Sequence, residues 1–211
     1  MTTAQDASGR EPSPRGTHAG VALIGGHPVL DFANTVAWRT DPDRRVARVT
    51  GAEAWLRWAV GVELLTAQET AALLGSAPPD PAGVTLLETW RSTLWAVLDA
   101  LVDDLPLPAE PWEKLRLSIA TARQEAFLAP ELPLRWQVRV TRCEDLAHAL
   151  ALRADELLAS PADIRRIRRC EGPGCGWFFL DRSRSGTRRW CSSGDCGNRD
   201  RARRHYHRSR A

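Results

Sequence analysis

The sequence predicts an α+β fold: a mainly α-helical N-terminal domain with a short β element, followed by a small cysteine-rich module. Three observations lead to this prediction. Apolar residues recur at helical spacing through most of residues 28–159, one stretch alternates apolar and polar residues, and four of the five cysteines lie in the last 48 residues. At 211 residues, 43% hydrophobic and 26% charged, the chain has the composition of one medium or two small globular domains. This excludes a disordered chain, a collagen-like chain and a coiled-coil rod.

Residues 1–20 are polar and rich in Gly, Pro and Ser, and they contain no apolar stretch of the kind that a secretory signal needs. We therefore expect a disordered tail over 1–20, with order beginning near Val21. No run of about 18 or more apolar residues is present, so no membrane span is expected. We therefore expect a cytoplasmic protein, in which the five cysteines serve as metal ligands or buried thiols rather than as disulfides.

Capping residues and apolar spacing place the first helices. Pro28 suits a first helical turn, and Leu30, Ala33 and Val36 share one face of a short helix that Asp41 ends. Two further helices each begin with a Thr that is followed three residues later by a Glu, the spacing of a capping box: Thr50 with Glu53, and Thr66 with Glu69.

Longer helices are predicted over about 82–103, 110–127 and 143–159, because apolar residues recur there every three or four positions and prolines follow each segment. Between the last two helices, residues 134–141 alternate apolar and polar side chains. That alternation predicts one half-buried strand.

Charge is distributed unevenly along the chain. Residues 164–211 contain 14 Arg and 4 acidic residues, a balance of +10, whereas residues 1–163 contain 15 basic and 22 acidic residues, a balance of −7. A basic end on an otherwise acidic chain predicts that this end binds a polyanion.

The cysteines form two pairs with equal spacing. Cys170 and Cys175 are separated by four residues, as are Cys191 and Cys196, and fifteen residues lie between the pairs. Four thiolates in two close pairs suit one tetrahedral, structural Zn²⁺ ion. Two disulfides and an iron–sulfur cluster are weaker alternatives, and a catalytic zinc is disfavoured because all four ligands are cysteines. Cys143 is expected to be a buried thiol.

The residues between and after the pairs predict the shape of the module. An apolar strand over 176–180 is followed by a turn and a returning strand over 188–190, and residues 197–208 are predicted to be helical. A loop bearing two cysteines, a β-hairpin and a helix that starts at the last ligand describe a treble-clef-like zinc finger, which the metal would stabilise.

Nucleic acid is the expected partner of this basic finger, with DNA the first choice, because the Arg guanidinium suits phosphates and guanine edges. RNA is the alternative, if Trp177, Phe178, Phe179 and Trp190 stack on bases rather than form a small core. A solvated charged face is a third interpretation. The candidate contacts are the exposed cations of the predicted helix and hairpin: Arg184, Arg188, Arg189, Arg199, Arg203, Arg204, His207 and Arg208.

The N-terminal domain has one candidate ligand pocket. Asp31, Asn34, Thr35 and Arg39 lie within a few helical turns, with Arg39 suited to an anionic small molecule. The structural alternative is that Asp31 serves the helix N-terminus and Asn34 bonds a neighbouring loop. No acid–base pair or nucleophile setting is present, so we expect no catalytic residue and no enzyme.

Two segments resemble a known family. Residues 166–208, with CGW-F-F-LD, G-x-RRWCS and then Cys196-Gly197-Asn198-Arg199, resemble the CGNR zinc finger, and residues 25–39 resemble the LDF-x-NT signature of the ABATE domain. The resemblance implies a bacterial transcription regulator, with an ABATE-like regulatory domain over 21–163 and a CGNR-type finger over 164–211.

A regulator of this kind would bind DNA through the finger and associate with the nucleoid, while the N-terminal domain senses an unknown effector or forms a homodimer. Two other functions stay open at this point. One is an enzyme or small-molecule-binding protein whose finger is only a tether, and the other is an RNA-binding or protein-interaction module.

Overall fold

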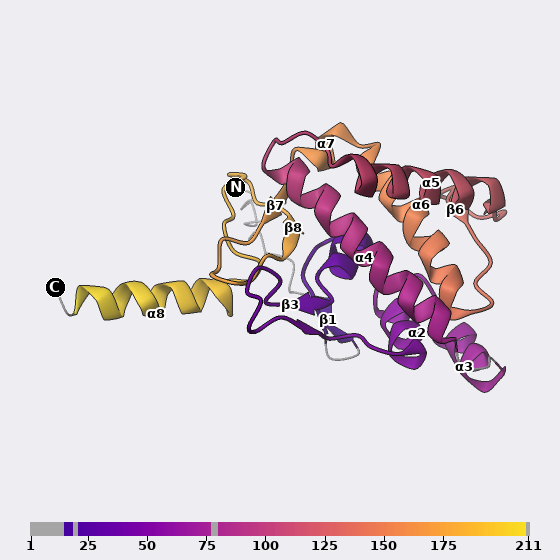
Figure 1. The fold of residues 1–211 in the computed structure, drawn as a ribbon, viewed down its shortest axis with the longest axis horizontal. Helices are drawn as coiled ribbons and strands as arrows, with labels where there is room; N and C mark the ends of the chain where they lie inside the picture. Colours follow the sequence, from indigo (N-terminus) through magenta and orange to yellow (C-terminus); the bar gives the residue numbers. More distant parts are fainter. Residues whose placement is uncertain (1–14, 19–20, 77–79, 210–211) are drawn as a thin grey trace, which may run out of the picture.

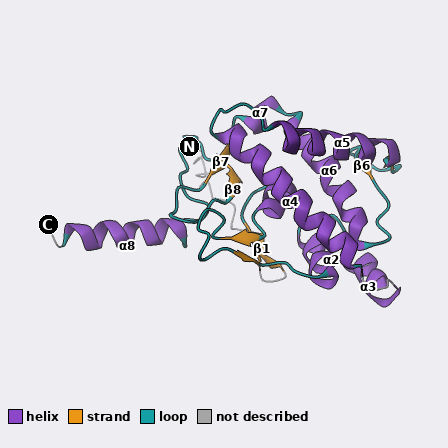
Figure 2. Cartoon of the chain, viewed as in Figure 1, coloured by secondary structure: helices purple, strands orange, loops and turns teal. Residues whose placement is uncertain are grey.

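The computed structural model describes residues 15–18, 21–76 and 80–209. Helices dominate this part of the chain, small two-stranded antiparallel sheets lie around them, and the last helix extends away from the body (Figures 1 and 2). The elements in chain order are β1 (Arg15–His18), β2 (Val21–Leu23), α1 (Pro28–Ala33), β3 (Val36–Ala37), β4 (Val46–Ala47), α2 (Ala52–Gly61), α3 (Ala67–Ser76), α4 (Pro81–Val102), α5 (Ala109–Glu125), β5 (Phe127–Leu128), β6 (Trp136–Gln137), a 3-10 turn (Cys143–Asp145), α6 (Leu146–Leu158), α7 (Pro161–Ile164), β7 (Ile167–Arg169), β8 (Phe178–Leu180) and α8 (Cys196–Arg208).

The core is an aromatic cluster around Phe32 of α1. The centroid of its ring lies 5.2 Å from that of Trp55, 5.8 Å from that of Trp58 and 5.2 Å from that of Trp90, which come from α2 and α4. Helix α1 also contacts α6, so this short helix lies at the centre of the body. The mainly helical fold with short β elements that the sequence predicts is confirmed.

Two predicted elements are shorter than expected. The first helix ends at Ala33 rather than near Asp41, because Val36–Ala37 pair with Val46–Ala47 as an antiparallel ribbon. The strand predicted over 134–141 is reduced to Trp136–Gln137, which pairs with β5. Leu134 remains 62% exposed, so the alternating pattern does not build a buried sheet face there.

One predicted capping box is present and the other is absent. The Thr66 main-chain N–H donates to Glu69 Oε2 at 2.7 Å, and the Glu69 N–H donates to Thr66 Oγ1 at 3.1 Å, before α3. Helix α2 instead begins after Gly51, which has a φ of 80° and no side-chain cap. The prediction of a Thr50–Glu53 box is therefore wrong.

This difference gives a matched pair of substitutions. We expect Thr66→Ala to lower the free energy of unfolding by about 1 kcal/mol, because it leaves a helix N–H group without its acceptor. Thr50→Ala, at an exposed Thr that caps nothing, is the control and should leave stability unchanged. Urea denaturation of both variants measures this, and equal losses of stability would contradict the assignment of the cap.

The chain start differs in part from the expected disordered tail over 1–20. Arg15–His18 form strand β1, which pairs antiparallel with β2. Residues 1–14 and 19–20 lie outside the described residues. No helix among the described residues is both long enough and apolar enough to cross a membrane.

The C-terminal module shares its core with the helical body. Ile167 of β7 and Phe178 and Leu180 of β8 belong to the same buried cluster as the helices. A second small cluster contains Phe179 and the four paired cysteines. The boundary between 21–163 and 164–211 stays a prediction, and buried side chains cross it.

Candidate metal centre and basic helix

The module contains the predicted β-hairpin and helix, but the hairpin uses a different strand. β8 pairs antiparallel with β7, and the loop between them carries Cys170 and Cys175. On the other edge of β8, Asn34 binds both main-chain polar groups of Phe178, and the Leu180 N–H donates to the Gly25 carbonyl at 2.9 Å. Both edges are thus occupied, which is why the predicted returning strand over 188–190 does not form.

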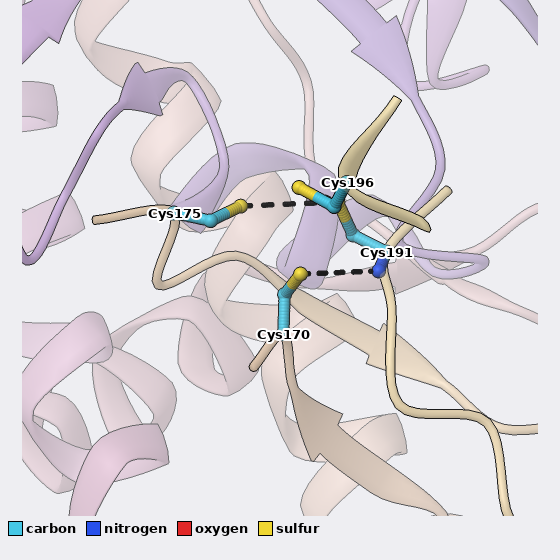
Figure 3. Close-up of side chains that lie close together, drawn as sticks. All are labelled: Cys170, Cys175, Cys191 and Cys196. Carbon is cyan, nitrogen blue, oxygen red and sulfur yellow. Dashed lines mark hydrogen bonds between the residues drawn. The ribbon is translucent and has the colours of Figure 1, made fainter. Parts of the chain in front are cut away.

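The four paired cysteines converge on one point (Figure 3). Their Sγ atoms all lie within 4.8 Å of one another, and all four residues are buried. The Cys175–Cys191 and Cys191–Cys196 sulfur pairs are 3.8 and 3.5 Å apart. Cys170 and Cys175 come from the β7–β8 loop, Cys191 from a second loop, and Cys196 is the first residue of α8.

These distances fit a single zinc ion. A tetrahedral ion with Zn–S bonds of about 2.3 Å holds its sulfurs about 3.8 Å apart. A disulfide needs its two sulfurs at about 2.05 Å, and a cluster of several irons would spread them further than one ion does. The prediction of one structural zinc held by Cys170, Cys175, Cys191 and Cys196 is confirmed in its ligand set.

Neighbouring donors favour the thiolate form of these ligands. The main-chain N–H groups of Gly172 and Cys191 donate to Cys170 Sγ at 3.4 and 3.3 Å, and Arg199 Nη2 donates to Cys196 Sγ at 2.8 Å. Hydrogen bonds from the other thiols, and then from this N–H of Cys191, lower the pKa of Cys170. Four thiolates and Zn²⁺ sum to −2, so a cation at Cys196 partly neutralises the complex.

Gly172 lies so close to two ligand sulfurs that a side chain does not fit at this position. A Cβ atom at this position would lie 2.9 Å from Cys196 Sγ and 3.4 Å from Cys170 Sγ. We therefore expect Gly172→Ala to displace a ligand sulfur and to weaken zinc affinity by about 10-fold or more. This is the size of the loss seen when a residue that supports a metal ligand is replaced.

Gly194→Ala is the matched control, since its Cβ would approach nothing nearer than Ser192 Oγ at 3.8 Å. Competition with a chromophoric zinc chelator compares the two variants. Equal zinc affinities would show that the site tolerates the extra methyl group and would contradict the prediction.

The loop after β3 is bound to the cysteine loop. The Arg39 N–H donates to the Cys175 carbonyl at 3.1 Å, and the Thr40 N–H donates to the Gly174 carbonyl at 3.3 Å. Gly176 has a φ of 66°, and a Cβ there would lie 2.8 Å from Thr40 Cγ2. The helical body therefore supports the metal loop directly, through main-chain contacts that the spacing of cysteines does not reveal.

The predicted ligand-pocket residues are mostly engaged inside the protein. Asp31 Oδ1 accepts from the Gly25 N–H at 2.7 Å, and Asn34 binds the main chain of Phe178 on β8. Thr35 Oγ1 donates to the Phe32 carbonyl at 2.7 Å and accepts from Arg91 Nη1 at 3.0 Å. The structural alternative thus accounts for the contacts of Asp31 and Asn34.

Arg39 lies beside a buried arginine that the sequence did not single out. Arg91 of α4 is only 5% exposed, and its Nε has no hydrogen-bond partner. The Arg39 guanidinium lies 5.0 Å from the ring centroid of Trp95, one turn along α4 from Arg91. Burial, and then the charge of Arg91, lowers the pKa of Arg39 to about 10. Neither guanidinium forms an ion pair within the described residues.

The predicted nucleic-acid contacts fall into two groups. In the segment before α8, Arg184 is exposed, whereas Arg188 donates to the carbonyls of Trp190 and Cys191 and Arg189 pairs with Glu171. On α8, all the candidates are exposed: Arg199, Arg203, Arg204, His207 and Arg208. Arg203 and Arg204 both pair with Asp200, at 3.1 and 2.9 Å.

Helix α8 projects from the body (Figure 1). Every residue from Arg201 to Ser209 is exposed, on all sides of the helix. The helix contains five Arg and one acidic residue. A polar helix of this length without a packing partner is only marginally stable in water.

The aromatic residues of the hairpin are part of the packing. Phe178 and Phe179 are fully buried, and Trp177 donates through Nε1 to the Val36 carbonyl at 2.7 Å. Trp190 packs partly buried against the cysteine cluster. Phe178 belongs to the core of the helical body, and the other three rings belong to the small cluster around the cysteines. Packing inside the protein, the alternative to base stacking, therefore accounts for all four rings.

Family comparisons match both parts of the chain. Residues 166–209 match the CGNR zinc finger, and residues 26–161 match ABATE, a family described as "Putative stress-induced transcription regulator". A search of curated proteins gave no match. The chain therefore belongs to the ABATE family, and its four-cysteine centre lies in a CGNR zinc finger that fits one structural zinc ion.

Proposed function

We propose that this protein is a DNA-binding transcription regulator whose zinc finger presents α8 to the duplex. The observation that carries the proposal is the projecting helix, exposed on every side from Arg201 to Ser209 and rich in arginine. Asp195 and Asp200 neutralise part of this charge, and the remaining positive charge favours binding of an anion beside the helix. The major groove, about 12 Å wide, admits one α-helix.

The dimensions support this assignment. With about 1.5 Å of rise per residue, a helix of this length extends for about 20 Å, enough to reach across a groove. The zinc complex fixes its first residue, Cys196, to the body, so the helix is presented in one direction. The burial of the hairpin aromatics favours duplex DNA over single-stranded RNA, which is bound by exposed rings. Such a regulator would act in the cytoplasm, on chromosomal DNA, and the proposal involves no catalytic step.

The test is the salt dependence of binding to a short random-sequence duplex, measured by fluorescence anisotropy between 50 and 200 mM salt. If six phosphates are neutralised, the log–log slope is about −5. Replacing Arg204 and Arg208 with Gln should reduce the magnitude of this slope by about 2. Replacing Arg135 and Arg139, two exposed arginines at β6 on the far side of the body, removes the same charge and is the control.

A flat salt response of the unchanged protein, or equal effects of the two double variants, would contradict DNA binding through α8. Tighter binding to single-stranded RNA than to the duplex would favour the RNA-binding function instead.

A second role is proposed for the helical domain: sensing a small anionic effector at Arg91 and Arg39. It is supported by Arg91, a buried cation that forms no ion pair with the described residues, because such a charge is costly unless an anion compensates it. Of the four residues predicted for this pocket, Thr35 and Arg39 would contact the effector. Asp31 and Asn34 would only hold the surrounding main chain in place.

Thermal denaturation in sulfate, phosphate and acetate at matched ionic strength tests this role. An anion that binds the folded state raises the melting temperature. The rise should disappear in Arg91→Gln and persist in Arg57→Gln, which changes an exposed arginine paired with Glu53. Equal rises in both variants would exclude an effector site at Arg91.

A further inference from the structure

A second basic element lies at the base of α8. The segment over residues 38–48, referred to below as the loop, contains the connection from β3 to β4, strand β4 itself and Arg48. It carries three exposed arginines: Arg44, Arg45 and Arg48. Figure 1 shows the β3 region beside the start of α8. These arginines lie about 150 residues before α8 in the sequence, outside the basic C-terminal segment, and charge patterning along the chain does not connect them to it.

The structure fixes this loop next to the finger helix. The guanidinium of Arg44 lies 3.4 Å from the ring centroid of Trp38, and that of Arg199 lies 4.6 Å from the same ring. One indole therefore holds a cation from the loop and a cation from α8. Arg48 and Arg199 also line the same small cavity, of about 60 Å³, beside Cys175.

The loop has little freedom to turn away. Its first residues are hydrogen-bonded to the metal loop through the Arg39 and Thr40 main chain. The Arg48 N–H donates to the Thr35 carbonyl at 2.7 Å, and β3 pairs with β4. Because both ends are fixed, the three arginines keep their position relative to α8.

The charges of the loop are not neutralised inside the protein. Within the part of the chain that the structure describes, Arg44, Arg45 and Arg48 form no ion pair. The loop also contains two acids, of which Asp43 is exposed and Asp41 packs against Gly174. On the α8 side, Arg199 pairs with Asp195 at 3.2 Å, and Asp195 lines the same cavity as Arg48. The three arginines of the loop are the cations of this surface that no carboxylate pairs among the described residues, an arrangement that favours a polyanion.

We infer that Arg44, Arg45 and Arg48 form a second arm of the nucleic-acid interface, which binds the phosphate backbone of duplex DNA beside the groove that α8 enters. This inference rests on the proposed DNA-binding function. It assigns a part of the interface to the ABATE domain itself, so the domain positions the finger on the duplex as well as supporting the zinc site. Contacts to phosphate orient a protein on the duplex and carry no base specificity.

The test uses the zinc-loaded chain of 211 residues and the random-sequence duplex. The loop variant replaces Arg45 and Arg48 with Gln, since neither side chain takes part in a hydrogen bond or ion pair within the described residues. We expect the salt slope to lose about 1.8 and the affinity at 0.1 M salt to fall on the order of 50-fold. The Arg135/Arg139 double variant, with the same change of charge, should bind within a few-fold of the unchanged protein.

Asp43→Asn is a second variant with the opposite expected sign, because it removes an exposed carboxylate from the same loop. Its affinity should rise several-fold, with unchanged zinc content. Misfolding does not produce tighter binding, so this variant separates the inference from a loss of structure.

Three results are informative in different ways. Loop and far-side variants that bind equally well, while the Arg204/Arg208 variant binds weakly, would overturn the second arm and leave DNA binding by α8 intact. A protein that does not bind the duplex at all would remove both the proposed function and this inference. Weakened binding by the loop variant together with tightened binding by Asp43→Asn establishes the second arm.

Discussion

Removal of zinc is expected to abolish the order of the cysteine loops and of α8, and to leave the helical body, together with β7 and β8, folded. Cys191→Ser, at a ligand that is only 1% exposed, should bind less than half an equivalent of zinc and lose the helical signal of α8. The physical reason is size: the small cluster around the metal contains Phe179 and the four cysteines, with Ile24, Trp177 and Trp190 packed against it. A core this small does not fold by burial alone, so zinc binding supplies the folding free energy, on the order of 10 kcal/mol.

Elemental analysis, far-UV circular dichroism and duplex binding measure this prediction together. The matched control is Cys143→Ala, which removes a buried thiol distant from the metal; burial and the nearby Asp80 and Asp145 raise the pKa of Cys143 to about 12. This variant should keep a full equivalent of zinc and bind DNA as the unchanged protein does. An ordered α8 in metal-free Cys191→Ser protein would contradict the structural role of the ion.

Asn34→Ala is expected to have the second largest effect. The Asn34 side chain accepts from the Phe178 N–H at 2.8 Å and donates to the Phe178 carbonyl at 2.8 Å, fully buried. The substitution leaves two buried main-chain groups without partners, at about 1–3 kcal/mol each. We expect the free energy of unfolding to fall by about 2–6 kcal/mol, together with weaker attachment of β8 to α1.

Chemical denaturation measures the loss of stability, and hydrogen exchange at the Phe178 amide locates it. Asn198→Ala is the control, because the side chain of that Asn is exposed: it donates to the Gly194 carbonyl and accepts from Arg201, and water can replace both bonds. It should cost well under 1 kcal/mol, as surface substitutions do. Similar losses for the two variants would mean that the Asn34 bridge does not hold the strand.

Local sequence features determined much of this protein. Apolar periodicity correctly placed the helices that became α4, α5 and α6, and the spacing of the cysteines identified the zinc ligands. The helices were predictable because the residues that define them act within a few positions of one another. The zinc ligands were predictable because they belong to a ligand set with strict chemistry. The Thr66–Glu69 cap was predictable on the same ground, since both partners lie within one turn.

The Thr50–Glu53 box and the strand over 188–190 failed because tertiary contacts overrode local preference. Gly51 precedes α2 in a conformation that excludes the capping box. The edge of β8 with which the returning strand would pair is already hydrogen-bonded to Asn34 and Gly25. Sequence periodicity does not report which edge of a strand is already occupied.

The sequence by itself determined that a tetrathiolate metal site lies beside a strongly basic helix. Only the tertiary structure decided that Asn34 of the ABATE signature occupies the second edge of β8, and that Arg91 is buried without an ion pair among the described residues. It also decided that Arg44 and Arg199 lie over one indole. The physical reason is separation along the chain: these contacts join residues from 56 to more than 140 positions apart, and the folded packing alone brings them together.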